Sequence, residues 1–181
     1  MRVISGTLKG RNIIGYNING TRPTMDRVKE SIFGTIQNYI KDSIVLDLFA
    51  GSGNLGIEAI SNGAKHCYFV DNNIEAIKVI KKNIAEFNIK DKSSILHEDY
   101  NKALNFFCNN KIKFDIIFVD PPYKYEIIDK IINKLIEYDL VNLEGIIVLE
   151  FSKDILKESY DNLKLIKCKK YGEKNVYIYK K

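Results

Sequence analysis

Residues 114–123 of this chain read FDIIFVDPPY, and they give the strongest indication of its fold. Its first part, Phe114–Val119, is short, apolar and rich in β-branched and aromatic residues, which predicts a strand buried on both faces. Two prolines end the strand; they fix φ and donate no N–H, so the backbone is stiff and its carbonyls are free to accept hydrogen bonds. The stretch therefore predicts a functional site at the carboxyl end of a strand, made of an acid, two prolines and an aromatic ring: Asp120, Pro121, Pro122 and Tyr123.

Composition describes a globular chain with a mild basic excess. The 181 residues are 45% hydrophobic and 28% charged, with a formal net charge of +5, which suits a single domain and permits a polyanionic partner without requiring one. The cysteines, Cys67, Cys108 and Cys168, have no paired spacing, so we expect no metal site. The amino terminus lacks a signal-peptide stretch and no run is long enough to span a bilayer, so we expect no membrane association and a cytoplasmic location.

Apolar runs and helical repeats alternate along most of the chain. We expect strands at 44–49, 67–71, 94–99, 114–119 and 145–150, helices at 55–61, 74–87, 102–108 and 126–137, and a closing antiparallel hairpin from 163–168 and 176–179. Strands that alternate with helices predict an α/β fold with a mostly parallel sheet covered on both faces. We divide this single domain, 1–181, into an extension at 1–40 and a core at 41–181.

The extension combines an expected hairpin with an expected helix. Residues 1–20 alternate in polarity around a basic turn, which predicts a β-hairpin, and a helix should follow Pro23 with its apolar stripe inward. Basic residues gather in the turn and at the start of this helix, and one explanation is a solvated face. We predict instead that five of them face the phosphates of a nucleic acid: Lys9, Arg11, Arg22, Arg27 and Lys29.

A glycine-rich turn, GSGNLG at residues 51–56, follows the first core strand and opens the next helix. This Gly-x-Gly-x-x-Gly spacing lets the backbone at Gly51 and Gly53 approach a ligand, and Asp71 ends the next strand, where a ribose-binding acid belongs. The motif by itself does not choose between a dinucleotide and another adenosine-containing cofactor.

The charge around this turn helps to choose the cofactor. Four acids fall at or near the ends of neighbouring strands: Asp47, Asp71, Asp99 and Asp120. A pyrophosphate would be repelled there, whereas the sulfonium and ammonium of S-adenosylmethionine suit an acidic crevice, which disfavours a dinucleotide oxidoreductase. We expect Asp71 to bind the ribose, Asp99 the adenine amine and Asp47 the ammonium. The other expected cofactor contacts are Phe49, Asn72 and Tyr100, the last as a wall for the ring.

These residues resemble a known group of enzymes. Asp-x-Phe-x-Gly-x-Gly at 47–53, together with the DPPY motif at 120–123, is similar to Rossmann-like S-adenosylmethionine-dependent methyltransferases that modify exocyclic amines. Three amino-terminal segments, RVISG at 2–6, KGR at 9–11 and RPTMDRVKE at 22–30, resemble the RsmD family. The chain has Asp71 where that family often has glutamate, and the shorter carboxylate can still chelate two hydroxyls.

The resemblance implies a fold, a reaction and a partner. It implies a seven-stranded sheet and methylation of the N2 amine of a guanine in small-subunit (16S) ribosomal RNA. Asp120 and the Pro121 carbonyl would accept hydrogen bonds from the amine, with Tyr123 stacked on the base. We expect the substrate to be a small-subunit particle and the protein to be a monomer.

Other functions share part of this pattern. The DPPY motif also occurs in DNA adenine-N6 and protein glutamine methyltransferases, although a sequence-specific DNA enzyme would be expected to carry an added recognition domain. A non-catalytic RNA-binding module is the alternative from another class, and it would not need an acid, two prolines and a ring at the methyl-transfer position.

Overall fold

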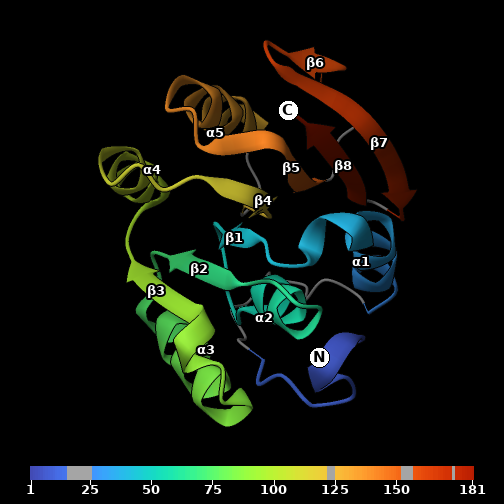
Figure 1. Ribbon diagram of the computed structural model, residues 1–181, viewed down its shortest axis with the longest axis vertical. Helices are drawn as coiled ribbons and strands as arrows, with labels where there is room; N and C mark the ends of the chain where they lie inside the picture. The colour runs from blue at the N-terminus through green and yellow to red at the C-terminus, as the bar shows by residue number, and fades with distance from the viewer. Residues whose placement is uncertain (16–25, 122–124, 152–156, 173) are drawn as a thin grey trace.

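A central eight-stranded sheet organises the chain in the computed structural model, in the order β3-β2-β1-β4-β5-β8-β7-β6 (Figure 1). The structure describes residues 1–15, 26–121, 125–151, 157–172 and 174–181, so the predicted Arg22, Pro122 and Tyr123 lie outside the described residues. The strands are β1 Ile44–Asp47, β2 His66–Asp71, β3 Ser93–His97, β4 Phe114–Val119, β5 Val141–Phe151, β6 Ser159–Tyr160, β7 Leu163–Tyr171 and β8 Lys174–Lys180.

The directions of the strands confirm the predicted fold class. Strands β1 to β5 pair in parallel, and the strand order reverses between β1 and β4, which are neighbours. Strand β8 pairs antiparallel with β5, and β7 pairs antiparallel with β8. The expectation of seven strands was wrong, because β6 adds a two-residue strand that pairs only with the start of β7. Two residues are too short for a periodic pattern to reveal.

In the described part of the chain, five α-helices cover both faces of the sheet: α1 Asp26–Ile40, α2 Asn54–Ser61, α3 Ile74–Phe87, α4 Tyr100–Asn109 and α5 Tyr125–Glu137. The apolar stripes of α1, α2 and α3 pack in one hydrophobic cluster with Ile116 and Phe118 of β4. Helices α4 and α5 pack in a second cluster with Ile117 and Val119. The central strand β4 is therefore buried on both faces, as its sequence predicted, and it brings Asp120 to the edge of the sheet.

Two local elements differ from the expectations. The amino-terminal segment forms an isolated bridge between Arg2 and Asn12 around a short 3-10 helix, η1 Gly6–Leu8, rather than a two-stranded hairpin. Its backbone groups bond to side chains of α2, which replace part of a strand ladder. The third core strand ends at His97 rather than 99, because the side chain of Asp99 accepts from the Asn101 N–H and caps α4. A second short 3-10 helix, η2 Lys90–Lys92, precedes β3.

The third glycine of the turn motif allows α2 to pack closely on β2. A Cβ at Gly56 would lie 2.6 Å from the Cys67 sulfur and still closer to the Phe69 ring. We predict that Gly56→Ala lowers the free energy of unfolding by about 1–3 kcal/mol, the usual cost of overpacking. Gly34→Ala in α1 is the matched control, since its Cβ would meet nothing within 4 Å, and it should stabilise by up to about 1 kcal/mol. Urea denaturation measures both; an unchanged midpoint for Gly56→Ala would show that α2 does not depend on this contact.

Candidate functional site

The carboxyl edge of the parallel strands gathers the predicted acids. Asp47 at the end of β1 is in register with Phe69 of β2 and Phe118 of β4, and Asp71 ends β2. Asp120 follows β4 directly, and Asp99 lies just beyond β3. Asp47 is buried, whereas the other three acids are partly exposed. The structure thus brings the four acids to one edge of the sheet, next to the glycine-rich turn.

Two of these carboxylates hold the glycine-rich turn in place. Asp71 Oδ2 accepts from the Gly51 N–H at 2.8 Å, and Asp47 Oδ2 accepts from the Gly56 N–H at 2.9 Å. Gly51 and Gly53 have φ of +55° and +78°, a left-handed conformation that favours glycine. An ionised carboxylate accepts about four hydrogen bonds, so both acids retain capacity for a ligand. The first role of Asp47 and Asp71 is therefore to shape the turn.

Burial and neighbouring carboxylates raise the pKa of two of these acids, Asp47 and Asp120. Burial raises the pKa of Asp47 to about 7, with the Gly56 N–H opposing that rise and the nearby Asp71 carboxylate adding to it. Burial also raises the pKa of Asp120 to about 7; Glu150 and Asp47 add to that shift, and Lys174 opposes it. Ionised carboxylates are thus costly at this edge, and a cationic ligand would relieve the cost.

Glu150 and Lys174 are functional candidates that the sequence reasoning missed. Glu150 lies near the end of β5, is 4% exposed and pairs with Lys174 at the start of β8. Both act on the charge state of Asp120. The strand-end pattern that selected Asp47, Asp71 and Asp120 also applies to Glu150 and was the available signal; Lys174 has no comparable signal, because its position depends on how the last hairpin pairs.

Aromatic and apolar side chains lie beside the acids at the β1–β3 side of the edge. The rings of Phe49 and Tyr100 pack against each other with centroids 5.9 Å apart. Ile74, the first residue of α3, is 48% exposed. Asn72 is exposed, and its carbonyl contacts the His97 ring at 3.1 Å. Together with Asp71 and Asp99, these groups offer flat apolar surfaces and hydrogen-bond acceptors, which suit a base and a ribose.

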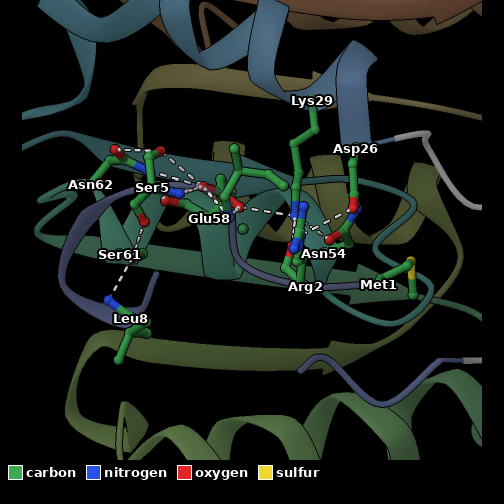
Figure 2. A network of polar contacts seen from close by, with 12 residues as sticks. Met1, Arg2, Ser5, Leu8, Asp26, Lys29, Asn54, Glu58, Ser61 and Asn62 are labelled. Carbon is green, nitrogen blue, oxygen red and sulfur yellow. Dashed lines mark hydrogen bonds and ion pairs between the residues drawn. The ribbon is translucent and has the colours of Figure 1, made fainter. Parts of the chain in front are cut away.

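A buried polar network supports the turn from its other side (Figure 2). Lys29 of α1 pairs with Glu58 of α2 at 2.9 Å, and both side chains are fully buried. Lys29 also donates to the Arg2 carbonyl at 2.5 Å and to Asn54 Oδ1 at 2.8 Å. Glu58 accepts from the backbone N–H groups of Ile4 and Ser5. The network ties the amino terminus, α1 and α2 together directly behind the glycine turn.

This network corrects the prediction for Lys29. A fully buried ammonium that pairs with Glu58 does not meet an RNA phosphate, so the expected RNA contact at Lys29 was wrong. The physical reason is that the buried Glu58 carboxylate needs a cation nearby. The sequence did indicate that Glu58 needs a buried partner, because Glu58 is the one charged residue in the otherwise uncharged stretch that forms α2. All eight residues of this helix are buried.

The basic turn lies away from the acidic edge. The Leu8 N–H donates to Ser61 at the far end of α2, and Arg11 donates to the Glu86 carbonyl and stacks on Phe87 at the far end of α3. Lys9 and Arg11 therefore lie at the amino ends of the parallel strands, whereas Asp120 lies at their carboxyl ends. Arg27 is exposed at the start of α1, which is the end nearer the site.

The described residues hold neither a metal-binding cluster nor a membrane span. In residues 1–15, 26–121, 125–151, 157–172 and 174–181, three or more His, Cys, Asp or Glu side chains nowhere gather so that they could hold a metal ion. Within the same ranges, no helix has both the length and the apolar character needed to cross a membrane.

The buried ion pair yields a stability prediction. Lys29→Met would leave the Glu58 carboxylate buried without its cation, so we expect the free energy of unfolding to fall by about 3–5 kcal/mol. The exposed pair of Lys78 with Glu75 is the control, and Lys78→Met should cost no more than about 0.5 kcal/mol. A double change, Lys29→Met with Glu58→Gln, removes both charges and should recover part of the loss. Denaturation in urea measures all three, and a loss below about 1 kcal/mol for Lys29→Met would contradict the role of the pair.

Comparison with known proteins places this geometry in a family. The family model described as Conserved hypothetical protein 95 matches residues 1–180. The chain is 40% identical to YlbH of Bacillus subtilis, itself only provisionally named an rRNA methyltransferase, over 100% of this chain and 99% of that protein. It is 32% identical to ribosomal RNA small subunit methyltransferase D of Haemophilus influenzae, over 99% and 93% of the two chains.

A solved structure shares the whole architecture. The Escherichia coli protein yhhF, provisionally named a methyltransferase, superimposes with a TM-score of 0.87 at 28% identity, covering 100% of this chain and 97% of that one. The family described as Conserved hypothetical protein 95 is the RsmD family that the motifs of this chain resemble, and its members are methyltransferases. Together these matches show that the chain belongs to this family.

Proposed function

We propose that this protein transfers a methyl group from S-adenosylmethionine to the N2 amine of a guanine in 16S ribosomal RNA. The observation that carries the proposal is the position of Asp120 and Pro121, a stiff pair of acceptors that follows the buried β4 at an edge rich in carboxylates. Relatives with 32% and 36% identity, from Haemophilus influenzae and Buchnera aphidicola, are named ribosomal RNA small subunit methyltransferase D. The proposal includes action as a monomer on a small-subunit particle in the cytoplasm.

The residues at the edge fit the proposed cofactor. Nothing lies within 4 Å of where a Cβ of Gly51 would be, so the turn is open on that side. Asp47, whose pKa is raised to about 7, favours a ligand that brings positive charge. Asp71 would hold the ribose, Asp99 the adenine amine, and Tyr100 with Phe49 would flank the base; Asn72 and Gly53 complete the proposed contacts.

The chain's own groups would prepare the amine for transfer. When bound, S-adenosylmethionine supplies an electrophilic methyl group. The Asp120 carboxylate and the Pro121 carbonyl would accept hydrogen bonds from the exocyclic amine, which favours a tetrahedral nitrogen and directs its lone pair. Such positioning provides most of the expected rate, because the amine would pass its proton to the Asp120 carboxylate or to water only as the new bond forms. From the motif, Pro122 would keep the turn stiff and Tyr123 would stack on the base.

Labelled methyl transfer tests the proposal directly. Small ribosomal subunits from a strain that lacks the gene would be incubated with the protein and labelled S-adenosylmethionine, and the RNA would be digested to nucleosides. We expect label in N2-methylguanosine, with subunits from the parent strain as the control that should accept little. Label on adenine or on protein would overturn the substrate and favour one of the alternative amine methyltransferases. Binding of subunits without transfer would favour a non-catalytic module.

The pKa of Asp120 predicts how the rate depends on pH. The ionised Asp120 carboxylate is a stronger acceptor for the amine than the protonated acid, and its folded pKa is raised to about 7. We therefore expect kcat/KM, which reports groups of the free protein, to rise with pH and level off above about 7. Asp120→Asn keeps an acceptor oxygen but removes the negative charge, so it should lower turnover by at least about 100-fold, the scale of a lost electrostatic contact with the transition state. It should also remove the rise with pH, with cofactor affinity nearly unchanged by calorimetry.

A second variant separates this effect from general damage. Lys174 lowers the pKa of Asp120, so Lys174→Gln should move the midpoint of the pH profile upward. Lys65→Gln, an exposed change next to the amino end of β2, is the control and should leave the midpoint in place. A profile that keeps its midpoint in Lys174→Gln would contradict titration of Asp120 as the source of the pH dependence.

A further inference from the structure

Helix α1 lies beside β7, at the right of Figure 1, and lysine side chains of β7 bond to hydroxyl groups of α1. Lys167 Nζ donates to Thr35 Oγ1 at 2.8 Å, and Lys169 Nζ donates to Ser31 Oγ at 3.3 Å. Lys169 also lies over the Tyr171 ring, 5.2 Å from its centroid. Ser31 and Thr35 are one helical turn apart on α1, and the exposed Arg27 lies one turn before Ser31. We call Arg27, Lys167 and Lys169 the α1–β7 seam.

The charge of the seam is not neutralised by carboxylates in the described part of the chain. Lys167 and Lys169 bond to hydroxyl groups, and neither forms an ion pair with a described residue. The cations at the two ends of the same face, in contrast, form ion pairs with carboxylates. Lys174 pairs with Glu150 near the site, and Lys180 pairs with Glu144 at the far end of β8. Along β7, Lys167 and Lys169 lie between the positions that pair with Lys180 and Lys174.

The seam leads to the acidic edge. Strand β7 is antiparallel to β8, which is antiparallel to β5, so β7 ends at the same edge as β4 and β5. Tyr171, the last residue of β7, donates to Ser31 in the first half of α1. Alternate residues of a strand are about 6.6 Å apart, so Lys167 and Lys169 lie one such step apart on a strand that runs toward this edge. The basic turn with Lys9 and Arg11 has no such position, because it lies at the opposite edge.

We propose that the α1–β7 seam binds successive phosphates of the RNA strand next to the target nucleotide. This proposal rests on the proposed function, and it deepens it by assigning the surface that receives the substrate backbone. Each ammonium would exchange a hydroxyl partner for a phosphate oxygen, a stronger charge-assisted hydrogen bond. Each phosphate neutralised releases counterions, so the seam would make RNA binding salt-dependent and would carry no base specificity.

The test measures RNA affinity as a function of salt. Anisotropy of the fluorescently labelled protein would be followed with small ribosomal subunits from a strain that lacks the gene. Lys167→Gln with Lys169→Gln should reduce the slope of log K against log salt by about two, one for each phosphate that is no longer neutralised. Lys167→Arg with Lys169→Arg keeps both charges and should retain the slope. The matched control, Lys41→Gln with Lys65→Gln, removes the same charge from exposed lysines next to the amino ends of β1 and β2, and should leave the slope unchanged.

Calorimetry with S-adenosylmethionine and the urea midpoint should be unchanged in the seam variant, which separates weaker RNA binding from damage to the fold. If the double variant does not fold, Lys167→Gln alone should reduce the slope by about one. An unchanged slope would overturn the proposal. The lysines would then have the role of preventing β7 from pairing with a strand of another molecule, since β6 covers only the start of β7.

A second probe keeps the two proposals apart. If the unaltered protein methylates no subunits, its binding to single-stranded polyuridylate would be measured in the same salt series. A slope on polyuridylate that falls in the glutamine variant and not in the control would support the seam, although the proposed reaction had failed. Methylation of subunits together with a seam variant of unchanged slope would support the reaction and overturn the seam.

Discussion

The hydrogen bonds from the Gly51 and Gly56 N–H groups to Asp71 and Asp47 are the constraint on which the site depends. They join the ends of β1 and β2 to the turn and to the first part of α2, and they fix the turn in a backbone conformation suited to glycine. They also concentrate negative charge at the switch point of the sheet, where Asp47 and Asp120 both have raised pKa values. The same contacts thus shape the candidate cofactor cradle and set its preference for a cation.

The Lys29–Glu58 pair supports this arrangement from behind. Removing two charges from water is costly, and the cost is offset here because Glu58 also accepts from Ile4 and Ser5 while Lys29 also donates to Arg2 and Asn54. The result is that the amino-terminal segment lies against α2 without a regular strand ladder. The start of α2, which closes the glycine turn, is thereby connected to α1 and to the first residues of the chain.

The net charge of +5 is the sum over two surfaces of opposite charge. Carboxylates gather at the ends of β1, β2 and β4, whereas Lys167 and Lys169 lie beside α1 with hydroxyl partners. A methyl donor with positive charge and an acceptor with a negatively charged backbone require this separation, because each would be repelled by the surface that attracts the other. Lys174 lies between the two surfaces, paired with Glu150, and it moderates the pKa of Asp120.

Features that depend on local pattern could be predicted from the amino-acid sequence. The buried β4, the glycine turn and the acids at the strand ends follow from the spacing of apolar residues, glycines and prolines within short stretches, and the structure places these elements as expected. Tertiary structure alone decided the features that depend on distant contacts. Lys29 is buried because it meets Glu58, Lys167 joins the seam because it meets Thr35, which is 132 residues away in sequence, and β6 exists because it pairs with the start of β7. The physical reason is that the spacing of polar and apolar residues predicts which side chains face the core. A buried charge or a short strand is instead stabilised by a partner elsewhere in the chain, and that partner comes into contact only when the chain has folded.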